Sequence, residues 1–358
     1  MNRLARRMAR AIEMDGPLSI AAFATMALHD REDGFYASRE SIGARGAFIT
    51  APEISQIFGE LLGLWCVQAW RDQGSPTPAR LVELGPGRGT LVKDALRAAH
   101  IAPDFLARLE VVLVETSPAL EAAQREQLRD APAATRWVSQ WDAIACDRPL
   151  FLLANEFFDA LPIRQFVMTQ KGWCERMVIV NAAGDLAFAL APISTPLDIP
   201  VERGAAEPGA VYETSPAAQG LVEEASRAIA ACGGGALFID YGHEGCGFGD
   251  TLQAVSRHRQ AGILDAPGES DLSAHVDFAA LARIASKAGA HAYGPIGQGE
   301  FLRTLGIGVR GARLAERNPA CAEDIAMAID RLTSKQEMGA LFKAFAISPG
   351  SAPPPPGF

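Results

Sequence analysis

Three glycines at alternate positions follow a short apolar run near residue 85. The run spans 81–84, and Gly85, Gly87 and Gly89 come directly after it. From Leu91 onward the apolar residues take helical spacing. A strand, tight turn and helix start in this order bring free N–H groups and an approachable main chain to a bound molecule. The stretch therefore predicts a ligand-binding loop.

The residues around this turn distinguish two classes of ligand. A dinucleotide fingerprint has its third glycine one residue later, where this chain has Thr90, and an acid about 20 residues further on. Glu83 stands just before the turn, where its carboxylate would repel a pyrophosphate but suits a cation. S-adenosylmethionine carries an ammonium and a sulfonium group and no phosphate, so it fits better. The turn residues expected to bind it are Glu83, Gly85, Pro86, Gly87, Gly89 and Thr90.

Further polar groups follow the later apolar runs of the chain. Glu115 and Thr116 follow one run, Asp142 follows a second, and Asn155 ends a third. The carboxyl ends of parallel strands meet at one edge of a sheet, so these groups are expected to converge there. We expect Glu115 to accept from ribose hydroxyls and Asp142 to lie near the adenine. The alternative for both acids is an exposed, solvated carboxylate.

The stretch from Asn155 to Pro162 is the best candidate for the reacting end of the site. Asn155 and Glu156 precede two phenylalanines, and Asp159 follows them. Methyl transfer depends mainly on holding the nucleophile in line with the sulfur–methyl bond. We expect Asn155, Glu156 and Asp159 to hold a cationic nitrogen substrate. The alternative is that the phenylalanines are core and Asp159 caps a helix or turn.

Two other polar stretches leave their roles open. His243 and Tyr241 follow a predicted strand and could move a proton from the substrate. A histidine in this position is more often a packing or hydrogen-bonding residue. The segment 271–277 contains a helix cap and a possible substrate contact.

Composition sets limits on the partners and the cellular location. The 358 residues carry a formal net charge of −9, which argues against a general nucleic-acid-binding surface. The cysteines lack metal-ligand spacing, so we expect buried thiols in a reducing compartment and no metal. Four arginines within 3–10 resemble a transit peptide, but Glu13 and Asp15 follow directly, which favours an amphipathic surface helix. We therefore expect a cytoplasmic protein with no membrane insertion, since no apolar run is long enough.

The order of elements predicts an α/β fold with a mostly parallel, doubly wound sheet. We expect an N-terminal helical region over 1–75, a Rossmann-like domain over 76–348 and a disordered tail over 349–358. Short runs with glycine turns predict an antiparallel β insertion over 162–215. Residues 42–55 read either as a connector or as a lid over the glycine turn. The expected strands are 81–84, 109–115, one near residue 137, 149–156, 234–242, 251–255 and 341–347.

Several of these motifs together resemble the MidA family. The resemblance runs in order from about residue 10 to 347 and rests on 42–55, 83–91, 114–118, 155–162, 239–242 and 271–278. It implies a class I, Rossmann-like S-adenosylmethionine-dependent methyltransferase. The family contains the mitochondrial arginine methyltransferase needed for respiratory complex I assembly. The resemblance therefore implies a protein arginine as substrate, in a quinone-module subunit of complex I. One departure is Ala47, where the family usually has an acid.

Two other functions stay open at this point. One is a cofactor-fold assembly factor that binds a partner protein and performs no chemistry, with the insertion and residues 42–55 as docking surfaces. The other is a methyltransferase that acts on a small molecule, which would need a closed apolar pocket beside Phe157 and Phe158. The oligomeric state also stays open, and a homodimer is compatible with the sequence.

Overall fold

The structure is a computed structural model that describes residues 1–37, 50–245, 247–256 and 259–358. These residues form two compact units, each built from separate segments of the chain. The sheet unit comprises Ile49–Phe158, Leu221–Gly242 and Phe278–Phe358, and the insertion unit comprises the described parts of Met1–Phe48, Asp159–Gly220 and His243–Asp277. The chain passes from one unit to the other between Phe158 and Asp159, inside the motif that was expected to carry the chemistry.

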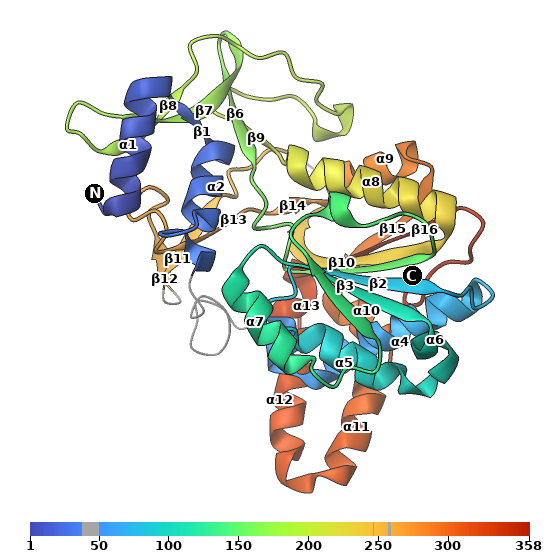
Figure 1. The fold of residues 1–358 in the computed structure, drawn as a ribbon. Coiled ribbons are helices and arrows are strands. Elements are labelled where there is room, and N and C mark those ends of the chain that lie inside the picture. Colours follow the sequence, from blue (N-terminus) through green and yellow to red (C-terminus); the bar gives the residue numbers. More distant parts are fainter. Residues whose placement is uncertain (38–49, 246, 257–258) are drawn as a thin grey trace. The chain divides into compact units, whose positions relative to one another are not determined.

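The sheet unit contains one large, mostly parallel sheet (Figure 1). Its strand order is β15-β16-β10-β5-β2-β3-β4. Neighbouring strands from β10 to β4 pair in parallel, whereas β16 pairs antiparallel with both β10 and β15. The order reverses at β2 and β5, where a doubly wound sheet binds its ligand. The strands are β2 (Ala79–Leu84), β3 (Leu109–Val114), β4 (Ala134–Val138), β5 (Leu150–Asn155), β10 (Gly234–His243), β15 (Ala290–Gly297) and β16 (Phe342–Pro349).

Helices cover both faces of this sheet because its central strands are apolar on both sides. Every residue of β2 is buried, as is usual for a parallel strand between two helical layers. In Figure 1, α4 and α5 lie on one face, and α8 and α9 lie on the other. Close approach of α4 to α5 needs Gly63, where a Cβ would lie 2.4 Å from the carbonyl oxygen of Ala95. The helices of this unit include α3 (Ala51–Ile54), α4 (Gln56–Asp72), α5 (Thr90–Ala98), α6 (Pro103–Ala107), α7 (Pro118–Gln127), α9 (Phe278–Lys287), α10 (Gln298–Thr304) and α13 (Met338–Leu341), and α8 (Pro216–Cys232) begins in the insertion unit.

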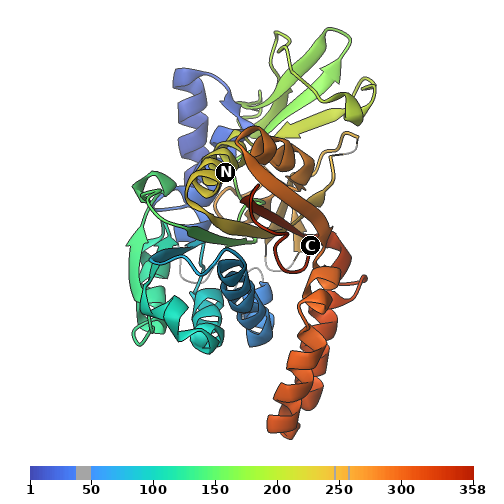
Figure 2. The same ribbon diagram turned by 90° about the vertical axis from the view of Figure 1, so that its right-hand side faces the viewer.

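A helical hairpin projects from the sheet unit (Figure 2). It consists of α11 (Ile307–Arg317) and α12 (Ala322–Thr333). Arg310 of α11 contacts the buried carboxylate of Glu60 on α4 at 2.6 Å, and Arg97 of α5 contacts the same carboxylate at 2.9 Å. These ion pairs fix the base of the hairpin to the helices that cover the sheet.

The insertion unit is largely antiparallel, as the sequence predicted. The strand order β1-β7-β6-β9 is extended by β8 along β7. The predicted strand at 251–255 does not join the parallel sheet, because β11 pairs antiparallel with β12 and β13 in this unit. Its elements are α1 (Arg3–Asp15), β1 (Leu18–Ser19), α2 (Ile20–His29), β6 (Arg164–Thr169), β7 (Gly172–Val180), β8 (Leu186–Leu190), β9 (Val211–Thr214), β11 (Gln253–Ser256), β12 (Arg259–Ala261), β13 (Asp271–Ser273) and β14 (Val276–Asp277).

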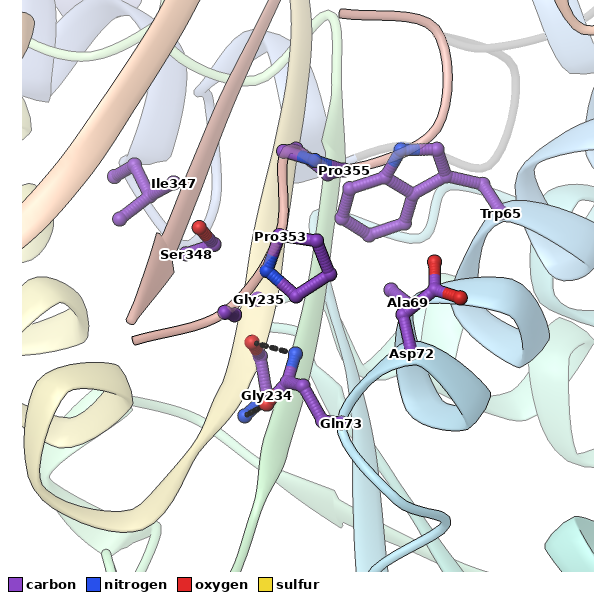
Figure 3. Close-up of a pocket in the computed structure, with 11 residues that line it drawn as sticks. Trp65, Ala69, Asp72, Gln73, Gly234, Gly235, Ile347, Ser348, Pro353 and Pro355 are labelled. Atoms are coloured by element: carbon purple, nitrogen blue, oxygen red, sulfur yellow. Dashed lines mark hydrogen bonds between the residues drawn. The ribbon is translucent and has the colours of Figure 1, made fainter. Parts of the chain in front are cut away.

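The C-terminal tail differs from its prediction. Residues 349–358, which were expected to be disordered, pack against the sheet unit (Figure 3). The indole of Trp65 donates to the carbonyl of Pro356 at 3.0 Å, and Phe358 packs on Phe301 with ring centroids 5.3 Å apart. The proline content suggested an unfolded segment, but prolines pack well where no backbone N–H has to be satisfied.

The predicted α/β fold class with a mostly parallel sheet is confirmed. The N-terminal region was predicted to end at residue 75, but the two units do not divide there. The segment 49–75 belongs with the sheet, because α4 packs on α5. Among the described helices, none combines the length and apolar character that a membrane span requires.

Candidate cofactor and active site

The glycine turn lies at the carboxyl end of β2, beside the point where strand order reverses. Gly85, Gly87 and Gly89 have φ angles of 59°, 53° and 83°, a region that side chains with a Cβ rarely adopt. Gly85 is exposed, and a Cβ there would lie 2.7 Å from the Phe157 ring. The turn then feeds α5 directly, with Gly89 as its N-cap and Thr90 as its first residue. The N–H groups at the start of α5 are thus available to a ligand.

Glu83 is the most unusual charged group of this region. Its residue is only 3% exposed, and its Oε2 atom has no hydrogen-bond partner among the described residues. Burial, with a smaller contribution from the nearby Glu115, raises the pKa of this carboxyl from an ordinary value of 4.5 to about 8, and a hydrogen bond from the Val92 backbone partly opposes the rise. A buried acceptor without a partner is costly, so it indicates that a donor is supplied from outside the chain.

Glu115 follows β3 and is held by neighbouring donors. Its two oxygens accept from the Ser117 amide at 2.7 Å and from the Gln124 side chain at 3.0 Å. Gln124 is completely buried and also donates to the carbonyl of Gly87 at 2.7 Å. The Trp137 indole donates to the side-chain oxygen of Gln124 at 2.9 Å. Gln124 thus connects the glycine turn with the ends of β3 and β4. Gln124 was not predictable from the sequence, because a glutamine within an amphipathic helix gives no signal of a site.

The end of β5 places Asn155 and Glu156 next to this turn, since Leu84 of β2 pairs with Ala154 of β5. Asn155 donates to Glu156 Oε1 at 3.0 Å, and the Oδ1 atom of Asn155 is buried without a partner among the described residues. Glu156 has a φ of 51°, a strained value for a residue with a side chain. Asp240 of β10 shapes this bend, because its Oδ2 accepts from the amides of Phe157 and Phe158 at 3.1 and 2.9 Å.

The short helix α3 forms another wall of the same region. The Ala51 amide donates to Glu156 Oε1 at 2.9 Å, and the Thr90 hydroxyl donates to Glu53 Oε1 at 2.5 Å. The described part of the predicted lid, residues 50–55, therefore contacts both the glycine turn and the end of β5. Residues 42–49 of that segment, Ala47 included, lie outside the described residues.

The other predicted site residues are placed differently. Asp142, in the 3-10 turn Trp141–Ala143 after β4, and Thr116 are both exposed. Asp159 belongs to the insertion unit, where its carbonyl accepts from the Ala274 amide at 3.0 Å. His243 also belongs to that unit, and burial lowers the pKa of its imidazole. Within the described part of the chain there is no cluster of three or more metal-ligating side chains.

The groups at the ends of β2 and β5 fit the chemistry of S-adenosylmethionine. Glu83 and Asn155 present two buried acceptors without partners, which suit ammonium donors. The glycine turn gives close access to the main chain, and Glu115 stands at the next strand end. No phosphate-binding cation is needed for such a ligand. The arrangement therefore favours this cofactor over a dinucleotide.

Comparison with known proteins agrees with this geometry. Residues 61–296 match a family described as S-adenosyl-L-methionine-dependent methyltransferase. The chain is 37% identical over 369 residues to the rat protein named "Protein arginine methyltransferase NDUFAF7, mitochondrial", covering 96% of this chain and 84% of the relative. The Drosophila melanogaster protein named as its homolog is 34% identical over 377 residues, covering 97% and 85%.

A solved structure shares the whole fold. A Burkholderia thailandensis protein bound to S-adenosyl-homocysteine is 30% identical, with a TM-score of 0.88 over 99% of this chain and 94% of that one. The comparisons also correct one prediction. The expected cytoplasmic location is contradicted, since the curated relatives are named as mitochondrial proteins. From the match over most of its length, the chain belongs to the family of S-adenosyl-L-methionine-dependent methyltransferases.

Proposed function

We propose that this protein transfers a methyl group from S-adenosylmethionine to an arginine side chain of another protein. The observation that carries this proposal is the similarity, over most of both chains, to relatives named protein arginine methyltransferases. The site geometry supports it, because carboxylates and an amide at the strand ends suit cationic groups. The cofactor supplies an electrophilic methyl group on its sulfonium.

The residues proposed to hold the cofactor all lie in the sheet unit. Glu83 and the Oδ1 atom of Asn155 would accept from its ammonium group, and the glycine turn would offer it close access to the main chain. Glu115 accepts from the ribose hydroxyls, with Gln124 and Ser117 fixing its orientation. Pro86, Thr90, Thr116 and Asp142 complete the proposed binding residues.

Glu156 is the proposed substrate-orienting carboxylate. Its Oε1 accepts from the Ala51 amide and from Asn155, so the carboxylate keeps one direction. A guanidinium stays charged at any working pH, and a fixed carboxylate both orients it and favours proton loss as the nitrogen attacks. Holding the nucleophile in line supplies most of the acceleration.

The proposed target is a subunit of the complex I quinone module, since the MidA family contains the arginine methyltransferase needed for complex I assembly. To test this, arginine methylation of complex I subunits is measured by mass spectrometry in cells with wild-type protein, with Glu156→Gln, and without the gene. We expect one methylated arginine in the first strain and none in the other two.

The matched control is Glu121→Gln, an exchange of a surface carboxylate on α7 that pairs with Arg125. This variant should keep the methylation. Methylation that persists in the Glu156→Gln strain would favour a binding role without chemistry. Methylation that persists without the gene would remove the proposed target.

A further inference from the structure

Two cysteines from distant parts of the sequence meet at the amino ends of two neighbouring strands. Cys146 lies four residues before β5, and Cys232 is the last residue of α8, two residues before β10. The strands pair in parallel from Leu150 opposite Gly234, and the Leu150 amide donates to the Gly233 carbonyl at 3.1 Å. The topology of the sheet therefore brings the two thiols to one place.

A direct contact joins the two residues. The thiol of Cys232 donates to the carbonyl oxygen of Cys146 at 3.1 Å. This contact places the Cys232 sulfur against the main chain of Cys146, and closing a disulfide requires the two Cα atoms to come to about 4.4–6.8 Å. Cys146 is exposed and Cys232 is half-buried, so a reagent in solution can reach the pair. Cys66 and Cys174, by contrast, are buried, as the sequence predicted for all the cysteines.

We propose that Cys146 and Cys232 form a thiol pair that closes into an intramolecular disulfide when a low-molecular-weight disulfide is present. With glutathione disulfide, the Cys146 thiolate attacks one sulfur and releases one glutathione thiolate, which takes up a proton. The Cys232 thiolate then attacks the Cys146 sulfur of the mixed disulfide and releases the second glutathione. Two protein thiols are oxidised, and one glutathione disulfide is reduced to two thiols.

The surroundings of Cys146 set the rate of this reaction. Burial, together with the neighbouring Cys232, raises the pKa of the Cys146 thiol, and the Arg80 guanidinium partly opposes this rise. Asp147 and Glu224 add negative charge. Since the thiolate is the attacking species, the exchange is slow at neutral pH and faster in mild alkali.

The bond would close a loop that contains the whole segment Asp159–Gly220 of the insertion unit. It would restrict the unfolded chain and so stabilise the folded one. The cofactor groups stand at the carboxyl end of β5, about 20 Å along the strand for six residues at 3.3 Å each. Oxidation should therefore leave cofactor affinity unchanged.

The test uses the purified full-length protein, incubated with glutathione disulfide at mildly alkaline pH. Free thiols are then alkylated, and the digested protein is analysed by mass spectrometry. We expect a peptide that links Cys146 to Cys232, and a rise in Tm of roughly 5–10 °C that a reductant reverses. Cys146→Ser and Cys232→Ser should lose both effects.

The matched control is Cys321→Ser, since Cys321 is half-exposed and contacts Asn318. This variant should form the bond and show the same rise in Tm. The proposal is overturned if both thiols are recovered alkylated. It is also overturned if glutathione stays attached to Cys146, or if the link joins two molecules. None of these outcomes bears on the proposed methyl transfer.

Discussion

Exchange of Glu83 for glutamine tests the electrostatics of the proposed cofactor site. The substitution keeps the shape of the side chain and removes its charge. In the free protein the pKa of Glu83 is raised to about 8, so at pH 7 about nine-tenths of the molecules carry a proton there. An ammonium ligand favours the charged carboxylate and lowers this pKa. Binding at pH 7 should therefore release almost one proton.

The affinity should depend on pH accordingly. Below the free-state pKa of about 8, binding that releases one proton becomes up to tenfold tighter for each unit by which the pH rises. Comparison of about pH 6 with about pH 7 avoids titration of the ligand's own amino group near pH 8. Glu83→Gln should bind more weakly and lose this dependence.

The same shift predicts the stability of the free protein. A carboxyl whose folded-state pKa lies above its unfolded value destabilises the fold as pH rises from 4.5 to about 8. At about 1.36 kcal/mol for each unit of pKa shift, this one group lowers the unfolding free energy by at most roughly 5 kcal/mol. Between pH 4.5 and about pH 8 the unfolding free energy of wild type should therefore fall, and that of Glu83→Gln should fall by up to roughly 5 kcal/mol less.

The assay is isothermal titration calorimetry in two buffers of different ionisation enthalpy, which counts the protons released. Asp94→Asn is the control, because Asp94 is another buried carboxyl whose pKa is raised, to about 6, and it pairs with Arg97 on the same helix. That variant should keep the proton release. Equal release by wild type and Glu83→Gln, or none by wild type, would refute the assignment of Glu83.

Three further variants test other parts of the site and its support. Gly85→Ala adds a Cβ to a residue with a φ of 59° and places it 2.7 Å from the Phe157 ring. Cofactor affinity measured by calorimetry should therefore fall at least tenfold. Unchanged affinity would exclude this turn from the cofactor site. Gln124→Leu removes a completely buried side chain's hydrogen bonds to three partly buried partners and should cost roughly 2–4 kcal/mol in urea unfolding; a cost below the error of the measurement would contradict it. Arg310→Ala leaves buried Glu60 with one cationic partner, Arg97, and should cost about 2 kcal/mol, without change in cofactor affinity.

The parallel sheet could be predicted from the sequence because its strands are strong local signals. β2, β3, β5 and β10 are apolar runs that end in polar groups, and the strand–helix alternation fixes their direction. The strand β15 was missed, since Ala290–Gly297 contains two glycines and a proline. Residues 251–255 were assigned to the wrong sheet, because alternation alone does not reveal which strands will pair.

The site, like the sheet, was only partly predictable from the sequence. The residues at the strand ends were predictable, as each follows its own apolar run. The hydrogen bonds that hold them were not predictable, because Gln124 and Glu53 act through contacts between distant segments. Family resemblance could not reveal that the chain changes units after Phe158. That division separates Asp159 from Asn155 and Glu156, which the motif presents as one group.

Methyl transfer to arginine can be tested with the purified protein. Purified protein is incubated with S-adenosylmethionine labelled on the methyl group and with a protein extract from cells that lack the gene. The extract is then hydrolysed, and the labelled amino acid is identified. We expect label in methylarginine with wild-type protein and none with Glu156→Gln. Label in another amino acid, or none despite calorimetrically confirmed cofactor binding, would contradict it.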